Sequence, residues 1–181
     1  MEKTKRGLAP VIGDAPEVLI LGSLPGDISI QKQQYYASPR NQFWRILSGV
    51  FDSPVGSTYA DRVEFVLTHK LALWDVLKSA DREGSLDSSI RKAVPNDFVA
   101  FFSAYSEIST IALNGGEASR KFRSVCGSFP EILADRRCIE LPSTSGVPGK
   151  NVLGLSEKIQ RWGVIRVAEQ SHAGDARNAC A

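Results

Sequence analysis

Cysteine and histidine, the residues that most often build metal centres and covalent catalytic sites, are scarce in this sequence of 181 residues. The three cysteines, Cys126, Cys138 and Cys180, show no CxxC spacing, which argues against a zinc or iron–sulfur site and indicates a reducing compartment. His69 falls at the end of an expected helix and His172 in a polar tail, so no Ser/His/Asp or Cys/His arrangement forms. We therefore expect a protein that works without a metal ion or any other cofactor.

Long hydrophobic runs and a strong excess of charge are also missing. No apolar run approaches the ~18 residues of a membrane span, and the start MEKTKRGLAP lacks the hydrophobic core of a signal peptide, which predicts a cytoplasmic protein. The formal net charge of +2 does not by itself indicate a nucleic-acid partner, although a one-sided basic groove is compatible with it. The content of 43% hydrophobic and 23% charged residues is that of an ordinary globular protein.

Short apolar runs alternate with helical patterns along most of the chain. Four runs have the pattern of buried strands: residues 18–21, 71–74, 110–113 and 137–141. Helical spacing or helix-start signals predict helices over residues 42–51, 59–69, 98–102, 117–125 and 153–162. Strands that alternate with helices predict an α/β fold, with a parallel sheet covered on both faces.

The two ends of the chain differ from the middle. Residues 1–16 are interrupted by Gly7, Pro10, Gly13 and Pro16, and we expect them to form a flexible leader. Residues 17–168 contain all the predicted elements and are expected to form a single domain, since their number suits one hydrophobic core. Residues 169–181 are polar and rich in alanine and glycine, which predicts a disordered tail.

Polar residues stand at the ends of all four predicted strands. They are Ser23, Asp75, Asn114 and Ser143. The carboxyl ends of parallel strands meet at one edge of a sheet, and ligands of open α/β sheets bind in the crevice there. We therefore expect these four residues to lie along one edge, and this convergence is the main indication of function in the sequence.

The connection after the first strand, about twenty residues, is long for a compact domain, and such loops are usually functional or disordered. Tyr35 and Tyr36 argue against disorder; they could stack on a base or pack against the edge of the sheet. Asn41 could orient a water molecule or cap the helix that follows. The turn GSLPG at residues 22–26 is neither a Walker loop nor a GxGxxG dinucleotide loop.

A second polar loop, PSTSGVPGK at residues 142–150, follows the last predicted strand. Its hydroxyl and backbone N–H groups suit contacts with the phosphates of a nucleic acid. A capping turn before the last helix would use the same residue types. Both interpretations remain open.

Five segments together resemble the uracil-DNA glycosylase superfamily, most of all its hypoxanthine-DNA glycosylase branch, a relative of the mismatch-specific uracil and thymine glycosylases. They are GSLPG (22–26), YASPRNQFW (36–44), LWDV (73–76), LNG (113–115) and LPSTS (141–145), and they follow the order expected of the family across about residues 17–163. The resemblance implies a three-layer α/β/α fold around a short, mostly parallel four-stranded central sheet. It also implies a monomer that flips a deaminated base, here hypoxanthine, out of DNA and hydrolyses its N-glycosidic bond, which initiates base excision repair.

The resemblance further implies roles for particular residues. Leu24 stands where many members carry an acid or amide that activates water, and the hypoxanthine branch moves this task to Asn41. Tyr36 matches the aromatic residue that stacks on the flipped base, while Asn114 would share the catalytic role by contacting base or sugar. The base would also be bound by Gly22, Ser23, Leu24 and Asp75. The DNA backbone would be contacted by Arg40, Pro142, Ser143, Thr144, Ser145 and Lys150.

Some positions depart from the pattern of this family. Ser38 stands where histidine is expected, and Leu141 replaces a histidine or asparagine that stabilises the departing base in some relatives. After Ser145 the chain reads GVP rather than PAN, which leaves Val147 or Pro148 as the residue that would wedge into the duplex. These departures bear on the preferred base more than on the reaction class.

Other functions remain open. One is a uracil or thymine mismatch glycosylase on the same fold, and another is a catalytically silent nucleic-acid-binding module, which Leu24 and Leu141 would favour. A nucleoside hydrolase is disfavoured because the sequence has no cluster of metal-binding aspartates. Duplexes that carry hypoxanthine, uracil, a thymine mismatch or xanthine would separate these possibilities.

Overall fold

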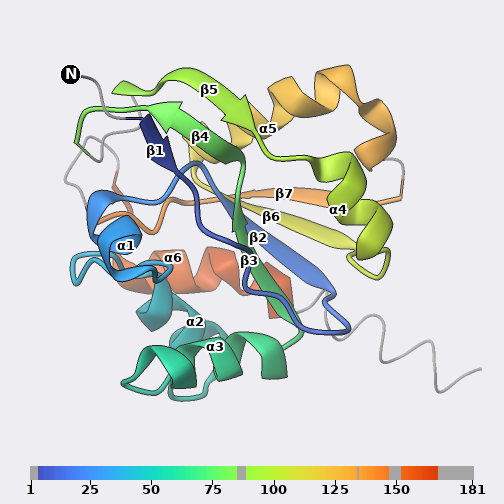
Figure 1. Cartoon of the computed structure of the whole chain (residues 1–181). Helices are drawn as coiled ribbons and strands as arrows, with labels where there is room; N and C mark the ends of the chain where they lie inside the picture. The colour runs from blue at the N-terminus through green and yellow to red at the C-terminus, as the bar shows by residue number, and fades with distance from the viewer. Residues whose placement is uncertain (1–3, 85–88, 134, 147–151, 167–181) are drawn as a thin grey trace, which may run out of the picture.

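A parallel sheet of four strands forms the centre of the fold (Figure 1). The structure, a computed structural model, describes residues 4–84, 89–133, 135–146 and 152–166. In the order β3-β2-β6-β7, the strands span Leu71–Asp75, Val18–Gly22, Thr110–Asn114 and Arg137–Leu141, with all three pairings parallel. The four predicted strands are thus confirmed, and β2, β3 and β6 each run one residue further than expected.

Helices cover both faces of this sheet (Figure 1). One face carries α2 (Phe43–Phe51), α3 (Tyr59–Thr68) and α6 (Leu155–Trp162). The other carries α4 (Phe98–Ala104), α5 (Gly116–Ser128) and the 3-10 helix η2 (Pro130–Leu133). The predicted three-layer α/β/α arrangement is confirmed. In the described part of the chain, no helix combines the length and apolar character needed to cross a bilayer.

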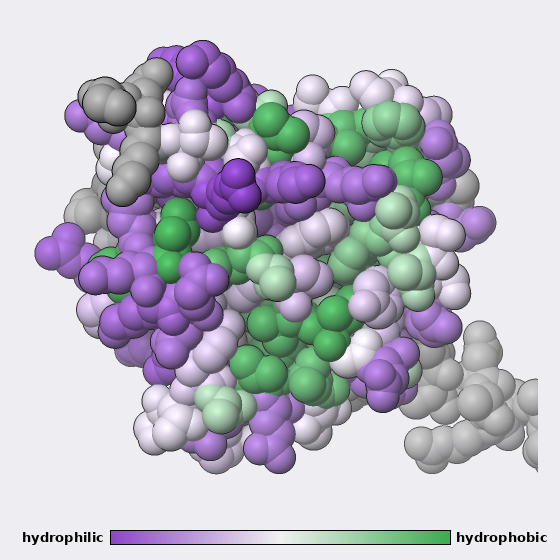
Figure 2. All heavy atoms as spheres, viewed as in Figure 1, coloured by the Kyte–Doolittle hydropathy of each residue, from purple (hydrophilic) through white to green (hydrophobic). Residues whose placement is uncertain are grey.

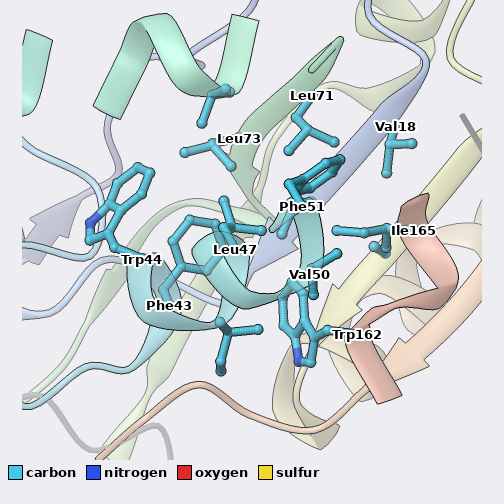
Figure 3. Close-up of a cluster of buried hydrophobic side chains, with 14 of the residues drawn as sticks. Val18, Phe43, Trp44, Leu47, Val50, Phe51, Leu71, Leu73, Trp162 and Ile165 are labelled. Carbon is cyan, nitrogen blue, oxygen red and sulfur yellow. The ribbon is translucent and has the colours of Figure 1, made fainter. Parts of the chain in front are cut away.

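The central strands contribute to two hydrophobic cores, one on each face. Val18 and Ile20 of β2 belong to the core under α2 and α6, whereas Leu19 and Leu21 belong to the core under α4 and α5. Successive strand residues point to opposite faces, so a strand buried on both sides has a continuous apolar run rather than an alternating one. Figure 3 shows the first core, where the sheet meets aromatic side chains that include Phe43, Phe51 and Trp162.

Three further strands form an antiparallel sheet that the sequence pattern does not predict. In it, β4 (Leu77–Asp81) pairs with both β1 (Thr4–Arg6) and β5 (Arg91–Pro95). Every residue of β5 is exposed, and its sequence RKAVP ends in proline. An exposed strand of this kind shows no alternation of apolar and polar residues, so periodicity cannot mark it.

The expected flexible leader over residues 1–16 needs correction for residues 4–16. Thr4–Arg6 forms β1, and Val11 exchanges two backbone hydrogen bonds with Leu73, at 2.9 and 2.8 Å. Leu8 and Val11 also pack against the core under α2. This stretch is therefore an edge of the fold, while residues 1–3 and the predicted tail at 169–181 lie outside the described residues.

The long loop after β2 also needs correction, because it contains a short helix. Residues Asp27–Lys32 form α1, which ends at Gln33 in a left-handed conformation with φ of 53°. A helix of six residues has little intrinsic stability, and its sequence DISIQK is too short to show a clear helical spacing of apolar residues. Its effect is to shorten the irregular part of the connection and to fix where Tyr35 and Tyr36 enter the fold.

Candidate active site at the carboxyl edge of the parallel sheet

The polar residues predicted to converge do lie at one edge of the sheet. Gly22 pairs in register with Asp75, and Asn114 with Leu141, so the loops after all four strands leave from the same edge. In Figure 1 this edge faces α1. It is the position at which open α/β sheets bind ligands.

Tyr36 occupies the middle of this edge in a conformation that side chains rarely adopt. Its φ is 52°, in the left-handed region, and non-glycine residues held there are concentrated at functional sites. Its ring stacks on that of Phe43, with centroids 3.7 Å apart and planes at 17°. Burial, and then the charge of Asp75, raise the pKa of Tyr36, so its hydroxyl stays protonated at neutral pH. One ring face is covered by Phe43, and stacking of a flipped base on the other face stays a prediction.

Asn114 joins Tyr36 to the loop after β7. Its Nδ2 donates to the Tyr36 hydroxyl and to Thr144 Oγ1, each at 3.0 Å. Its Oδ1 accepts from the backbone N–H of Thr144 at 2.9 Å. Both amide hydrogens are engaged within the protein, so in this arrangement only Oδ1 keeps a lone pair for a substrate. The predicted contact of Asn114 with base or sugar stays a prediction.

Gly22 leaves room that any side chain would fill. A Cβ at this position would lie 2.5 Å from Asp75 Oδ1 and 3.6 Å from the Tyr36 hydroxyl. The carboxylate of Asp75 is buried, and its backbone carbonyl accepts from Asn96 Nδ2 at 2.8 Å. Glycine therefore brings a carboxylate, a tyrosine hydroxyl and bare backbone together at the predicted base site.

The turn at residues 22–26 contributes backbone rather than side chains. The side chain of Leu24 is buried in the core under α4, and Ser23 is also buried. Leu24 occupies the place of a water-activating acid in the family pattern, and its packing explains how an apolar residue is accommodated there. The predicted role of this turn in binding the base therefore falls to its peptide groups.

Asn41 lies one residue before Gln42, the N-cap of α2, and its side chain bonds to the first residue of the helix. Its Oδ1 accepts from the backbone N–H of Phe43 at 2.9 Å, while its own N–H donates to the carbonyl of Ser38. Asn41 is half-buried and stands directly before Gln42, whose N–H donates to the Thr144 carbonyl at 2.9 Å. The residue thus lies where the loop after β2 meets the loop after β7, and Oδ1 retains a second lone pair for water.

The loop at residues 142–146 is anchored at several points. The carbonyl of Pro142 accepts from Trp162 Nε1 at 2.9 Å, Thr144 is buried, and the Ser145 N–H donates to Ser143 Oγ. Ser143 remains exposed, as a phosphate contact requires. Lys150, together with the two candidate wedge residues Val147 and Pro148, lies outside the described residues.

Arg40 and Gly146 hold these two loops in direct contact. A Cβ on Gly146 would run into the backbone carbonyl of Arg40, so only glycine allows this approach. The Arg40 side chain is exposed. Glycine after Ser145, which departs from the family pattern, is therefore explained by close packing of the loops.

Lys158 of α6 is a buried cation that sequence reasoning missed. Only 2% of it is exposed, and its Nζ donates to Gln42 Oε1 at 2.9 Å and to the Ser145 carbonyl at 3.4 Å. Burial lowers the pKa of Lys158. No helical pattern distinguishes a lysine beneath two loops from one on a solvated face, so only the tertiary contacts could reveal it.

Comparison with known proteins shows the family of this chain. The model of the uracil DNA glycosylase superfamily matches residues 9–161. The chain belongs to the uracil DNA glycosylase superfamily. The match spans every element that builds the edge described above, from β2 to α6.

Two relatives of the superfamily carry a more specific name. A hypoxanthine DNA glycosylase of Methanosarcina acetivorans is 39% identical over 143 residues, which cover 78% of this chain and 87% of the relative. One of Methanosarcina barkeri is 41% identical over 112 residues, 61% of this chain and 71% of the relative. The solution NMR structure of a candidate uracil DNA glycosylase from Methanosarcina acetivorans covers 91% of this chain and 99% of its own, with 32% identity and a TM-score of 0.73.

Two surface hollows do not include the residues predicted to contact the base or water. One, of about 460 Å³, is lined by residues around Gly115, Leu141, Ser143 and Arg161 and borders the loop after β7. The other, of about 610 Å³, is lined by Pro95–Ala100, Ser103, Val125, Phe129 and Ile132. In Figure 2 hydrophobic residues reach the surface on this side of the molecule, where α4 and α5 lie. Neither hollow contains Tyr36, Asn41 or Asp75.

Potential metal ligands are dispersed. Within residues 4–84, 89–133, 135–146 and 152–166, no group of three or more His, Cys, Asp or Glu side chains is placed to hold a metal ion. Cys126 is buried and Cys138 exposed, and both thiols are free. Burial raises the pKa of the Cys126 thiol to about 11, so it is a poor nucleophile at neutral pH.

Proposed function

We propose that this chain is a DNA glycosylase that flips hypoxanthine out of DNA and hydrolyses its N-glycosidic bond. The superfamily supports the reaction class, and the names of the two relatives support the base. The observation that carries the proposal is the edge at which a tyrosine, a carboxylate and Asn114 meet beside Gly22. Asn41 belongs to the loop that is tied to the same edge through Gln42 and Thr144.

Tyr36 and Asp75 would recognise the base. The free face of Tyr36 would stack on the purine, a contact worth about 1–3 kcal/mol in other proteins. Hypoxanthine has a proton on N1 where adenine has a lone pair, so a carboxylate at Asp75 would accept from hypoxanthine and repel adenine. Hypoxanthine also pairs less well in duplex DNA than a normal base, which lowers the cost of flipping it.

Asn41 would place the water molecule. As the C1′–N9 bond breaks, its electron pair leaves with the purine and positive charge develops on the sugar, where DNA phosphates help to stabilise it. Water then adds to C1′ and gives up a proton, the departing purine anion takes one up, and the products are an abasic site and free hypoxanthine. Since an amide is no strong base, positioning must supply most of the effect.

The two linked loops would hold the DNA backbone. Arg40, next to Asn41 in the sequence, would offer an exposed guanidinium, Ser143 an exposed hydroxyl, and Lys150 a second cation. Changing Arg40 to Gln should weaken binding to all sequences alike and lower the salt slope by about one unit. An unchanged salt slope would remove Arg40 from the interface.

The test of this function separates the structural role of Asn41 at the start of α2 from its chemical role. Serine can accept the same hydrogen bond from the N–H two residues on, so Asn41→Ser should keep near wild-type stability, whereas Asn41→Ala should lose about 1 kcal/mol. Both variants should slow base release under single-turnover conditions by about 100-fold or more, with DNA affinity little changed. Thr58→Ala is the matched control, because Thr58 caps α3, a helix that carries none of the proposed site residues, and should lose stability without losing activity. A rate equal to wild type in Asn41→Ser would refute the proposed role.

A substrate panel tests the base preference. Duplexes that carry hypoxanthine, uracil, a thymine mismatch or xanthine are treated with the protein and then with alkali, which cleaves abasic sites. Fastest cleavage at hypoxanthine supports the proposal, and preference for uracil or thymine would make the chain a pyrimidine glycosylase. Binding without any cleavage would identify a silent nucleic-acid-binding module.

A further inference from the structure

All four carbonyl groups of residues 22–25 accept hydrogen bonds from the chain that follows β3. The carbonyls of Gly22 and Ser23 accept from the N–H groups of Val76 and Leu77, at 2.8 and 3.1 Å. Those of Leu24 and Pro25 accept from the two terminal nitrogens of Arg82, with Nη1 at 3.2 Å from the Leu24 oxygen. The whole turn is therefore tied to the segment that runs from Val76 to Arg82.

The orientation of the carbonyls fixes that of the amides. Across a trans peptide the C=O of one residue and the N–H of the next point in opposite directions. The N–H groups of Ser23, Leu24 and Gly26 therefore point away from the groups that hold the carbonyls before them. Proline has no N–H, so of the two carbonyls that Arg82 holds, only that of Pro25 sets the direction of a donor, the Gly26 N–H. The turn begins at Gly22, which lies beside Asp75 and the Tyr36 hydroxyl, where the base is proposed to bind.

Backbone N–H groups hold the carbonyls of Gly22 and Ser23, whereas a side chain, that of Arg82, holds those of Leu24 and Pro25. Arg82 directly follows β4 and lies outside every motif that resembles the family. Only 2% of it is exposed, although removing an arginine from water is costly and its guanidinium stays charged in proteins. Its planar fork of donors suits two adjacent carbonyls, which a single ammonium group would match less well.

We propose that Arg82 is a positioning residue of the glycosylase reaction. By holding the carbonyls of Leu24 and Pro25, it fixes the turn whose peptide groups are proposed to contact the departing purine, and it places a positive charge against that turn. As the C1′–N9 bond breaks and its electron pair moves onto the base, preorganised donors of this kind stabilise the developing negative charge. The effect belongs to the chemical step, and this inference rests on the proposed glycosylase function.

The test compares Arg82→Met and Arg82→Lys with wild type on a hypoxanthine duplex. Arg82→Met should reduce the single-turnover rate about 10- to 100-fold, somewhat less than the ~10²–10³-fold loss from deleting an oxyanion donor outright. Its dissociation constant for DNA should change less than about threefold, and Arg82→Lys should recover part of the rate. In Arg82→Met the rate should also rise as pH falls, because protonation of the purine replaces the missing stabilisation of the leaving group.

Two controls separate this role from simple support of the fold. Arg6→Met removes an exposed arginine from the same antiparallel sheet and should leave rate and pH profile unchanged. Phe122→Leu weakens the core under α5 and should lower stability without altering the pH profile. The inference is overturned if Arg82→Met matches wild type in rate, if its loss lies wholly in DNA affinity, or if Phe122→Leu shows the same pH profile. A wild-type protein that releases no base from any duplex would instead overturn the proposed function.

Discussion

Replacing Asn114 with alanine should destabilise the protein and uncouple the two loops that it joins. The side chain makes three hydrogen bonds, at 3.0, 3.0 and 2.9 Å, to the Tyr36 hydroxyl, Thr144 Oγ1 and the Thr144 N–H. At about 0.5–1.5 kcal/mol for each net hydrogen bond, the expected loss is about 1.5–4.5 kcal/mol. Typical domains are stable by only about 5–15 kcal/mol, so urea denaturation would resolve the change.

A double-mutant cycle shows whether the loss of stability comes from the hydrogen bonds of the Asn114 side chain. Tyr36→Phe and Thr144→Val each remove one hydroxyl partner of Asn114 with little change of shape, and each should cost about 1 kcal/mol. In a protein that already carries Asn114→Ala, both substitutions should cost far less, because their partner is gone. The urea midpoint and slope would be measured for all combinations.

The same series refutes the reasoning if its members behave independently. Costs of Tyr36→Phe and Thr144→Val that are the same with and without Asn114 would mean that the three hydrogen bonds contribute no coupling. A loss below about 0.5 kcal/mol for Asn114→Ala, within the range of ordinary surface substitutions, would have the same meaning. Either result would leave Asn114 free to act on the substrate directly.

Three other substitutions test the site from different sides. Burial lowers the pKa of Lys158 below its ordinary value of 10.5. At pH values between the folded-state pKa and 10.5, the unfolded chain therefore binds more protons than the folded one, so wild-type stability should rise as pH rises toward 10.5. Urea denaturation at a series of pH values, with Lys158→Met as the reference, measures this rise. Gly22→Ala would place a methyl group 2.5 Å from Asp75 Oδ1, and it should cost about 1–3 kcal/mol in urea denaturation and abolish base release. Gly146→Ala should push the loop off the Arg40 carbonyl, which weakens DNA binding measured by fluorescence anisotropy more than it lowers the melting temperature.

The sequence was informative wherever a local pattern determined the structure. The run from Val18 to Leu21 is apolar at every position because the strand is buried on both faces, and this pattern alone predicts a parallel strand. Asp75 and Asn114 stand at the ends of such strands, so their meeting at one edge followed from topology. The expected stacking of Tyr36 on a base stays a prediction, and in the structure its ring packs against Phe43.

The parts that escaped prediction depend on contacts between distant residues. β5 is exposed at every position and is a strand only because β4 lies beside it. Arg82 and Lys158 look like ordinary surface cations in the sequence, yet both are buried under loops 58 and 116 residues away, at Leu24 and Gln42. Propensity and periodicity describe a residue by its neighbours in sequence, so they cannot report such partners.

The way in which the loops are tied together bears on how hydrolysis without histidine or a strong base is possible. When the water-binding group is an amide, little of the barrier can be lowered by proton transfer, and the remaining contribution must come from fixed geometry and fixed charges. Here the loop with Asn41 is hydrogen-bonded to Thr144, Lys158 ties Gln42 to Ser145, and Asn114 ties Thr144 to Tyr36. These connections exist before DNA binds, so the cost of ordering the site falls on folding rather than on the reaction. A variant that loosens one connection should therefore slow base release even where it touches neither base nor sugar.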